Sequence, residues 1–260
     1  MLPITRPIRR LILKRLRQIE RDQKISILYA CESGSRAWGF PSENSDYDVR
    51  FIYVHPRNWY LAIETDRKSD TIERPLEHDI DMAGWDLRKT LGLLYKSNPP
   101  LLEWLRSPIV YLERPSAREL RILAARYFSP AACAWHYVNM AKANYREYLR
   151  GPIVHLKKYF YVLRPLLAVQ WIEEKREPVP MEFIKLVRSQ LKDDTLRDRI
   201  EELTQMKRSG KELDRGPRIP ILNHFIETEL ARLVKPSFPF SSSRPPVEHL
   251  NQFFRARLSI

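Results

Sequence analysis

The stretch that decides the fold is Ser33-Gly34-Ser35-Arg36-Ala37-Trp38-Gly39, which is followed by Ser45-Asp46-Tyr47-Asp48-Val49. The preceding residues 25–31 form an apolar run whose pattern predicts a strand buried on both faces. The chain must turn sharply after this strand, and Gly34 tolerates the backbone angles of such a turn. Because a turn into a short helix presents free backbone N–H groups, we expect it to bind an anion such as phosphate.

A pair of carboxylates follows this turn. Asp46 and Asp48 lie two positions apart along a predicted strand at 47–54, so their side chains project from one face of the sheet. An isolated Asp-x-Asp is most simply a solvated strand face, but the glycine turn and the apolar strand before it favour a metal site. Neighbouring carboxylates repel unless a cation lies between them, and Mg²⁺ prefers oxygen ligands. The sequence therefore predicts a site for a metal ion and a nucleotide.

The next predicted strand, at 77–83, supplies candidates for a third carboxylate. Asp79 and Asp81 share a face of this strand, so geometry leaves both open. Arg50 lies two positions beyond Asp48 on the same strand face, where it can pair with the acids or contact a phosphate. The predicted site thus contains a cation of its own beside the carboxylates.

These motifs resemble the signature of the DNA polymerase β-like nucleotidyltransferase superfamily. The similarity is closest to the bacterial and phage family of predicted nucleotidyltransferases called RNA-ligase-associated proteins. It continues through Asp81-Met82-Ala83-Gly84-Trp85-Asp86-Leu87-Arg88-Lys89 and Asn98-Pro99-Pro100-Leu101-Leu102-Glu103-Trp104-Leu105. The motifs cover residues 28–112, and a weaker match includes Lys157-Lys158-Tyr159 and Arg164-Pro165-Leu166.

The resemblance implies roles for the three carboxylates. In that superfamily the first two acids bind both metal ions, and the third acts on the ion that activates the acceptor hydroxyl. It follows that Asp46 and Asp48 would bind two Mg²⁺ ions, with Mn²⁺ as an alternative. Asp81 is the preferred third ligand, because it stands where the family has an Asp before its Gly-Trp. Such ions stabilise the attacking oxygen and the leaving pyrophosphate in an in-line displacement at the α-phosphate.

The resemblance also implies five contacts to a nucleoside triphosphate. Gly34 and Ser35 would hold the β- and γ-phosphates through backbone N–H groups and the hydroxyl, while Arg36 is either a cationic contact or a surface residue. Lys158 and Arg164 are candidates because helical domains of this superfamily commonly return a lysine or an arginine to the triphosphate. The simpler interpretation of these two is a basic helix face over solvent.

The predicted elements indicate an α+β protein with two domains. Residues 1–112 are expected to form the catalytic domain, a nucleotidyltransferase fold with a mixed sheet and helices. Residues 113–260 are expected to form an all-helical domain that contains an irregular Pro/Ser-rich segment at 235–246. Within the first domain, Gly84-Trp85-Asp86 is expected to start a helix, with Asp86 as its N-cap.

Composition and charge limit the functional classes. The 260 residues carry a formal net charge of +13, which favours a polyanionic partner, nucleic acid above all. The basic segment 1–17 has apolar residues at helical spacing, so we expect a helix packed on the sheet rather than a targeting or membrane-surface segment. No window approaches the apolar length of a membrane span. Two distant cysteines, Cys31 and Cys133, suit a reducing cytoplasm.

These observations predict an enzyme of the nucleotidyltransferase type. The favoured activity is Mg²⁺-dependent transfer of a nucleoside monophosphate from an NTP, ATP by preference, to a hydroxyl group with release of pyrophosphate. The favoured acceptor is an RNA end, in RNA repair or end modification, on the basis of the charge and the resemblance. Nucleotidylation of a protein or a small molecule is the alternative, and a catalytically silent nucleic-acid-binding module is the second alternative.

Overall fold

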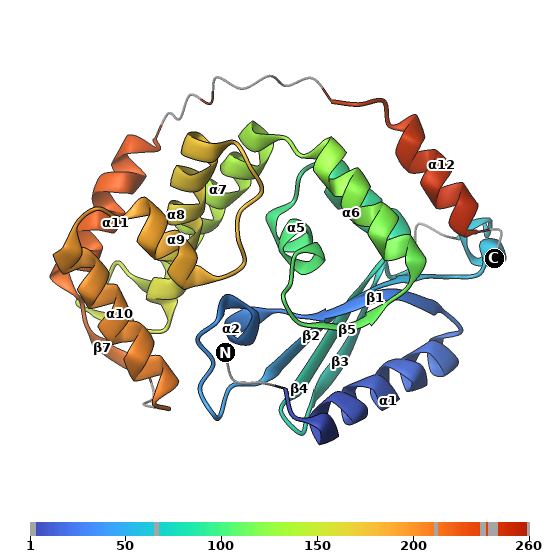
Figure 1. Ribbon diagram of the computed structural model, residues 1–260, viewed down its shortest axis with the longest axis horizontal. Helices are drawn as coiled ribbons and strands as arrows, with labels where there is room; N and C mark the ends of the chain where they lie inside the picture. Colours follow the sequence, from blue (N-terminus) through green and yellow to red (C-terminus); the bar gives the residue numbers. More distant parts are fainter. Residues whose placement is uncertain (1–3, 65–67, 211–212, 235–237, 239–243, 259–260) are drawn as a thin grey trace. The chain divides into compact units, whose positions relative to one another are not determined.

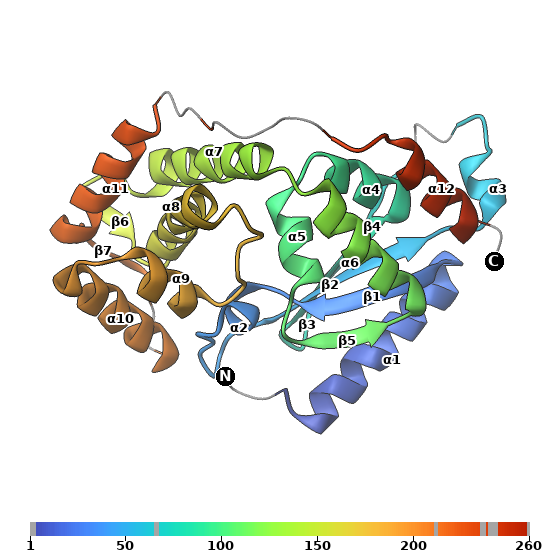
Figure 2. The same ribbon diagram turned by 45° about the horizontal axis from the view of Figure 1, so that its top comes forward.

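The computed structural model describes residues 4–64, 68–210, 213–234, 238 and 244–258 (Figures 1 and 2). The chain divides into two compact units, which we call the sheet unit and the helical unit. The sheet unit comprises Met1–Ala37, Asp46–Phe128 and Ser243–Ile260, and the helical unit comprises Trp38–Ser45 and Ser129–Ser242. Most of the predicted Pro/Ser-rich segment 235–246 lies outside the described residues.

A mixed sheet forms the centre of the sheet unit. Its described strands are β1 (Ser26–Glu32), β2 (Tyr47–Val54), β3 (Thr71–Glu77), β4 (Ile80–Asp86) and β5 (Val110–Glu113), in the order β3-β4-β2-β1-β5. Among these strands β2 and β4 pair in parallel, and the other neighbours pair antiparallel. The α+β class with a mixed sheet and helices is therefore confirmed.

Helices lie on both faces of this sheet, with α1 on one face and α5 and α6 on the other (Figures 1 and 2). The described helices of the unit are α1 (Arg6–Gln23), α2 (Gly34–Trp38), α3 (Arg57–Tyr60), α4 (Leu87–Tyr95), α5 (Pro99–Leu105), α6 (Pro115–Tyr127) and α12 (Glu248–Arg257). Trp38, at the end of α2, belongs to the helical unit.

The helix α1 packs on the sheet, as the spacing of its apolar residues predicts. Ile12, Leu16 and Ile19 are buried in one cluster with the β2 residues Phe51 and Tyr53. Since side chains alternate along a strand, the intervening β2 residues point to the other face of the sheet. The core thus determines which face is left for the polar residues of β2.

The helical unit is built around α8. Its described helices are α7 (Pro130–Tyr148), α8 (Lys158–Lys175), α9 (Phe183–Gln190), α10 (Asp194–Arg208) and α11 (Pro220–Arg232). Long stretches of α8 are buried, including Phe160, Leu163 and Leu167. None of the described helices is long and apolar enough to cross a membrane.

The helical unit departs from the all-helical expectation. Two short strands, β6 (Ile153–His155) and β7 (Arg215–Pro217), pair antiparallel between the helices. At Gly216 a Cβ atom would lie 2.9 Å from the Leu156 side chain, so the glycine permits this close approach. The two strands form a β-ribbon between segments that are far apart in sequence. Local sequence patterns do not reveal such a pairing.

The division of the chain differs from the predicted boundary at residue 113. The sheet unit continues to Phe128, because α6 packs against β1. The segment Trp38–Ser45 is grouped with the helical unit, where Phe40 stacks on Phe160 with 4.7 Å between ring centroids.

The predicted strand at 77–83 is also corrected. A tight turn at His78 and Asp79, with φ angles of 51° and 57°, separates β3 from β4. Gly84 and Trp85 belong to β4 and do not start a helix. The N-cap prediction is confirmed, because the Asp86 side chain accepts a hydrogen bond of 2.8 Å from the backbone N–H of Arg88.

The two glycines of this region allow a test of the core. A Cβ atom at Gly84 would overlap the Phe51 ring and lie 2.5 Å from its Cδ2 atom, whereas one at Gly92 in α4 meets nothing within 4 Å. We expect Gly84→Ala to lower the free energy of unfolding by about 1–3 kcal/mol through overpacking. Gly92→Ala should raise it by about 0.5–1 kcal/mol through helix propensity. Urea denaturation of both variants measures the difference, and equal effects would contradict this packing.

Candidate active site

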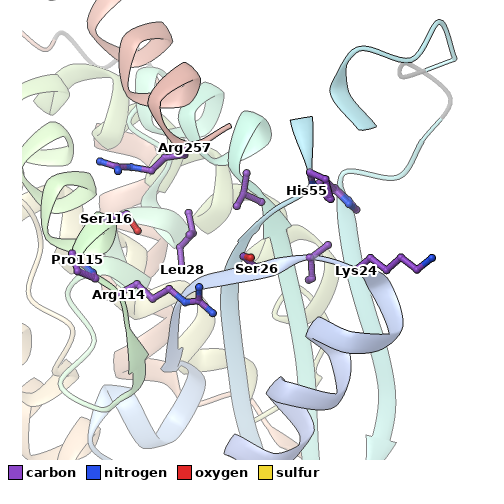
Figure 3. A pocket seen from close by; sticks show the side chains of 11 residues that line it. Lys24, Ser26, Leu28, His55, Arg114, Pro115, Ser116 and Arg257 are labelled. Atoms are coloured by element: carbon purple, nitrogen blue, oxygen red, sulfur yellow. The ribbon is translucent and has the colours of Figure 1, made fainter. Parts of the chain in front are cut away.

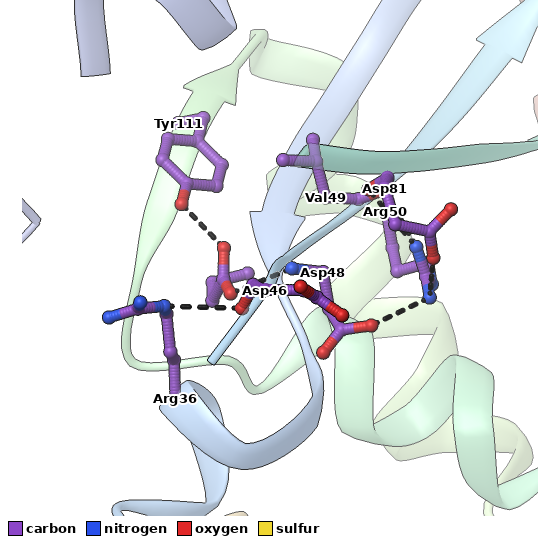
Figure 4. A network of polar contacts seen from close by, with 8 residues as sticks. Arg36, Asp46, Asp48, Val49, Arg50, Asp81 and Tyr111 are labelled. Atoms are coloured by element: carbon purple, nitrogen blue, oxygen red, sulfur yellow. Dashed lines mark hydrogen bonds and ion pairs between the residues drawn. The ribbon is translucent and has the colours of Figure 1, made fainter. Parts of the chain in front are cut away.

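Two carboxylates face each other across the parallel pair of strands. Asp48 of β2 and Asp81 of β4 are direct partners in the strand register. The Arg50 Nη2 atom lies 3.0 Å from Asp48 Oδ1 and 2.7 Å from Asp81 Oδ2 (Figure 4). A cation therefore already bridges the pair, as two neighbouring carboxylates require.

The parallel register of β2 and β4 also distinguishes Asp79 from Asp81, the two candidates for the third acid. Asp79 lies in the turn before β4, and its backbone carbonyl accepts a hydrogen bond of 2.7 Å from the Tyr47 N–H. Asp81 lies on the strand itself, opposite Asp48. The structure thus brings Asp81, and not Asp79, into the cluster with Arg50.

Asp46 lies immediately before β2 and is exposed. Its backbone carbonyl accepts a hydrogen bond of 3.2 Å from Arg36 Nε (Figure 4). Arg36 is buried, with its guanidinium 4.0 Å from the centroid of the Tyr47 ring. In this arrangement Arg36 fixes the backbone that carries Asp46 and is not a surface residue, while its contact to a phosphate stays a prediction.

The glycine turn packs directly against the Asp48 carboxylate. Gly34 has a φ angle of 56°, and a Cβ atom there would lie 2.6 Å from Asp48 Cγ. The Ser33 N–H donates to the Asp48 carbonyl at 2.8 Å, which holds the turn against β2. The first N–H groups of α2, at Gly34 and Ser35, have no partners within the helix, as at every helix start. They are the groups expected to bind phosphate.

Glu32, which sequence reasoning missed, lies under this turn. Its buried carboxylate accepts hydrogen bonds from the Asp48 N–H at 2.9 Å and from the Tyr111 hydroxyl at 2.5 Å. Burial raises the pKa of Glu32 to about 7, and these two hydrogen bonds only partly oppose the rise. A single acid at the end of an apolar strand, directly before Ser-Gly-Ser, is the signal that could have identified it.

An open groove extends from Asp81 along β4. Arg50 and Asp81 line it together with Trp85 and Trp104. The rings of Trp85 and Trp104 stack with centroids 3.8 Å apart. The cluster is therefore accessible from outside and has an aromatic wall.

Lys158 and Arg164, which the sequence analysis predicts to contact the triphosphate, both lie in the helical unit. The Lys158 ammonium lies 4.0 Å from the ring centroid of Tyr148. Arg164 is 2% exposed, lies 5.0 Å from the Trp38 ring centroid and donates to the Pro180 carbonyl at 3.3 Å. Arg164 thus contributes to packing within its unit, and a phosphate contact by either residue stays a prediction.

The acids fit a hard cation in their chemistry. Within the described part of the chain, no three His, Cys, Asp or Glu side chains converge on one point as a ready-made metal site. Asp48 and Asp81 nevertheless present oxygen atoms to a single positive group, the Arg50 guanidinium. Asp48 and Asp81 could therefore help to hold a divalent cation, which prefers such oxygen ligands.

A Gly-Ser turn against the carboxylate of one strand, with a second carboxylate in register on the parallel neighbour, defines the class of nucleotidyltransferases related to DNA polymerase β. The sequence matches the family described as "RNA repair pathway DNA polymerase beta family" over residues 8–256. The chain belongs to this family, and it is a nucleotidyltransferase.

Two known proteins are similar to the chain. The uncharacterized protein YcgL of Bacillus subtilis is 51% identical over 225 residues, which cover 86% of each chain. The crystal structure of a nucleotidyltransferase-like protein from Exiguobacterium sibiricum is similar with 12% sequence identity and a TM-score of 0.33. That match covers 85% of this chain and 77% of the other.

The buried Glu32 predicts a pH dependence of stability. Its pKa is about 7 in the folded protein and 4.5 in the reference state, so the folded protein retains a proton that the unfolded chain releases. The resulting stabilisation is complete below the lower value and is lost as the pH rises through the higher one. Glu32→Gln keeps a hydrogen-bond acceptor but cannot ionise. As the pH rises through this range, the free energy of unfolding of the wild type should fall by up to about 3 kcal/mol relative to that of Glu32→Gln.

Chemical denaturation of both proteins across this pH range measures the effect. Glu73→Gln, at an exposed position of β3, is the matched control and should give a constant difference from the wild type. Parallel stability curves for wild type and Glu32→Gln would contradict the assignment.

Proposed function

We propose that this nucleotidyltransferase transfers a nucleoside monophosphate from an NTP, ATP by preference, to a hydroxyl group of RNA in a Mg²⁺-dependent reaction. The observation that carries the proposal is the registered pair Asp48 and Asp81, bridged by a cation and placed beside the Gly34 turn. The family description, which names an RNA repair pathway, supports RNA as the acceptor.

In this proposal Gly34 and Ser35 bind the phosphates of the NTP through the first N–H groups of α2. Asp46, Asp48 and Asp81 would hold two Mg²⁺ ions, for which Mn²⁺ can substitute. When bound, such ions neutralise charge on the attacking and the leaving oxygen atoms.

The bond changes follow an in-line displacement. The acceptor hydroxyl oxygen forms a bond to the α-phosphorus, and the bond from that phosphorus to the bridging oxygen of the β-phosphate breaks. Pyrophosphate leaves with this electron pair. Asp81 assists the loss of the hydroxyl proton, which passes to solvent.

Glu32 and Arg50 support these groups from within the sheet unit. Glu32 fixes the backbone of Asp48 by accepting its N–H, so the carboxylate keeps its position under the turn. Arg50 neutralises Asp48 and Asp81 while no other cation is near. The groove along Trp85 and Trp104 gives the base or the acceptor an aromatic surface.

Asparagine substitutions test the proposal, because they remove charge with little change of shape. We expect Asp48→Asn and Asp81→Asn each to slow RNA-stimulated pyrophosphate release by about 10²-fold or more, which is ~2.7 kcal/mol of transition-state stabilisation. Asp79→Asn is the matched control, because Asn tolerates the left-handed backbone of the turn and Asp79 lies outside the cluster. It should retain nearly full activity.

The assay compares the common NTPs with Mg²⁺ or Mn²⁺, with and without RNA, and follows label transfer to the acceptor. If the label appears on a protein or a small molecule instead of RNA, the proposed acceptor is wrong but the proposed nucleotidyl transfer is correct. If no NTP releases pyrophosphate under any of these conditions, the proposed reaction is wrong.

A further inference from the structure

One face of α1 carries only cations. At about 100° per residue, the positions within the helix, which are all but the C-cap, fall within an arc of about 80°. They are exposed, and they are Arg6, Arg10, Lys14, Arg17, Arg21 and Lys24, the last being the C-cap. We call this set the α1 stripe.

The stripe is not explained by ion pairing within the chain. Among the described residues, none of its members forms a salt bridge, and the acids of α1 pair elsewhere: Glu20 with Arg114 and Asp22 with Arg74. Charges of alternating sign along a helix face are typical of a solvent-exposed helix that forms many ion pairs. The α1 stripe lacks this alternation, because all its members are cations.

The stripe also costs the helix stability. Like charges at i, i+4 spacing, as at Arg6 and Arg10, destabilise a helix. Arg6 lies at the positive end of the helix dipole, and the first turn holds no acid to compensate. A bound polyanion would remove both penalties.

The stripe begins at the end of the sheet where the acids lie. Arg9, in the second turn of α1, donates to the Val110 carbonyl at 2.6 Å and lies 5.5 Å from the Tyr111 ring centroid. The Tyr111 hydroxyl bonds to Glu32, which accepts the Asp48 N–H. From this end the stripe extends along α1 for about 27 Å.

At its other end the stripe reaches a cavity of about 310 Å³ (Figure 3). Lys24 lines this cavity together with Arg114, Arg257 and Ser116, and no acidic side chain of the described residues lines it. The cavity also borders the start of α6, at Pro115 and Ser116. Because Arg114 pairs with Glu20 and Arg257 pairs with Glu119, the cavity adds little positive charge to that of Lys24.

We propose that the α1 stripe binds the phosphate backbone of RNA, and that it holds the acceptor strand whose end is modified at the Asp48–Asp81 cluster. This inference rests on the proposed function and adds the surface that binds its acceptor. An anionic membrane is the less suitable partner, because the apolar face of α1, with Ile12 and Leu16, is buried against the sheet. The helix therefore has no apolar face to insert.

The test compares two variants of the full chain with equal loss of charge. One is Arg10→Gln/Lys14→Gln/Arg17→Gln in the stripe. The control is Arg88→Gln/Lys96→Gln/Arg118→Gln, which changes exposed cations elsewhere in the sheet unit. Glutamine retains helix propensity and length, so both proteins should fold, and circular dichroism verifies this.

The measurement is the affinity for a labelled single-stranded RNA oligonucleotide as a function of salt concentration. The stripe variant should bind roughly 10- to 100-fold more weakly, and its slope of log K against log salt should fall in magnitude by about 2. The control should bind like the wild type. Equal losses in both variants would mean that only net charge matters and would overturn the proposal, as would an unchanged stripe variant.

Two further arms separate this inference from its alternatives. Cosedimentation with phosphatidylserine vesicles that depends on the stripe, together with RNA binding that does not, would assign the surface to membranes and overturn the proposal. If RNA binding depends on the α1 stripe but no label reaches RNA, the stripe is an RNA-binding surface and RNA is not the acceptor. If RNA is labelled equally well by the stripe variant, the proposed function stands and the role of the stripe in holding the acceptor fails.

Discussion

The parallel pairing of β2 with β4 is the constraint on which the site depends. It sets Asp48 directly opposite Asp81, close enough for one guanidinium to contact both. A shift of one residue in this register would turn one acid into the core with Phe51 and leave Arg50 with a single partner. The packing of α1 on the opposite face prevents that shift, because it fixes which β2 residues are buried.

A second constraint acts on the backbone around the turn. Glu32 is buried at an energetic cost, and it accepts hydrogen bonds from two segments, at Asp48 and Tyr111. Gly34 then closes over Asp48 with no room for a side chain. The polar contacts of β1, β2 and β5 hold the carboxylate in place before any substrate binds, which is the arrangement that catalysis by positioned charges requires.

Local signals in the sequence predicted the parts of the site that local chemistry determines. The turn at Gly34, the acids that follow it and the cap at Asp86 depend on neighbours within a few residues. The sequence did not identify Glu32, since its partner Tyr111 lies 79 positions away. It left Asp79 and Asp81 open, because the turn before β4 uses two non-glycine residues with positive φ, which turn patterns rarely indicate. The β6–β7 ribbon was missed for the same reason as Glu32.

The carboxylates of the site and the cations of the α1 stripe lie on different parts of the sheet unit. Carboxylates at the site repel the phosphates of any nucleic-acid acceptor, and the charge of Arg50 is already neutralised by Asp48 and Asp81. Attraction for a polyanion must therefore come from cations outside the cluster. The α1 stripe offers six of them in a row that starts at the same end of the sheet, and their sum is felt over a Debye length of about 10 Å at moderate salt. Because these cations lie on the far side of α1 from the core, they can bind RNA without neutralising the acids that the reaction needs.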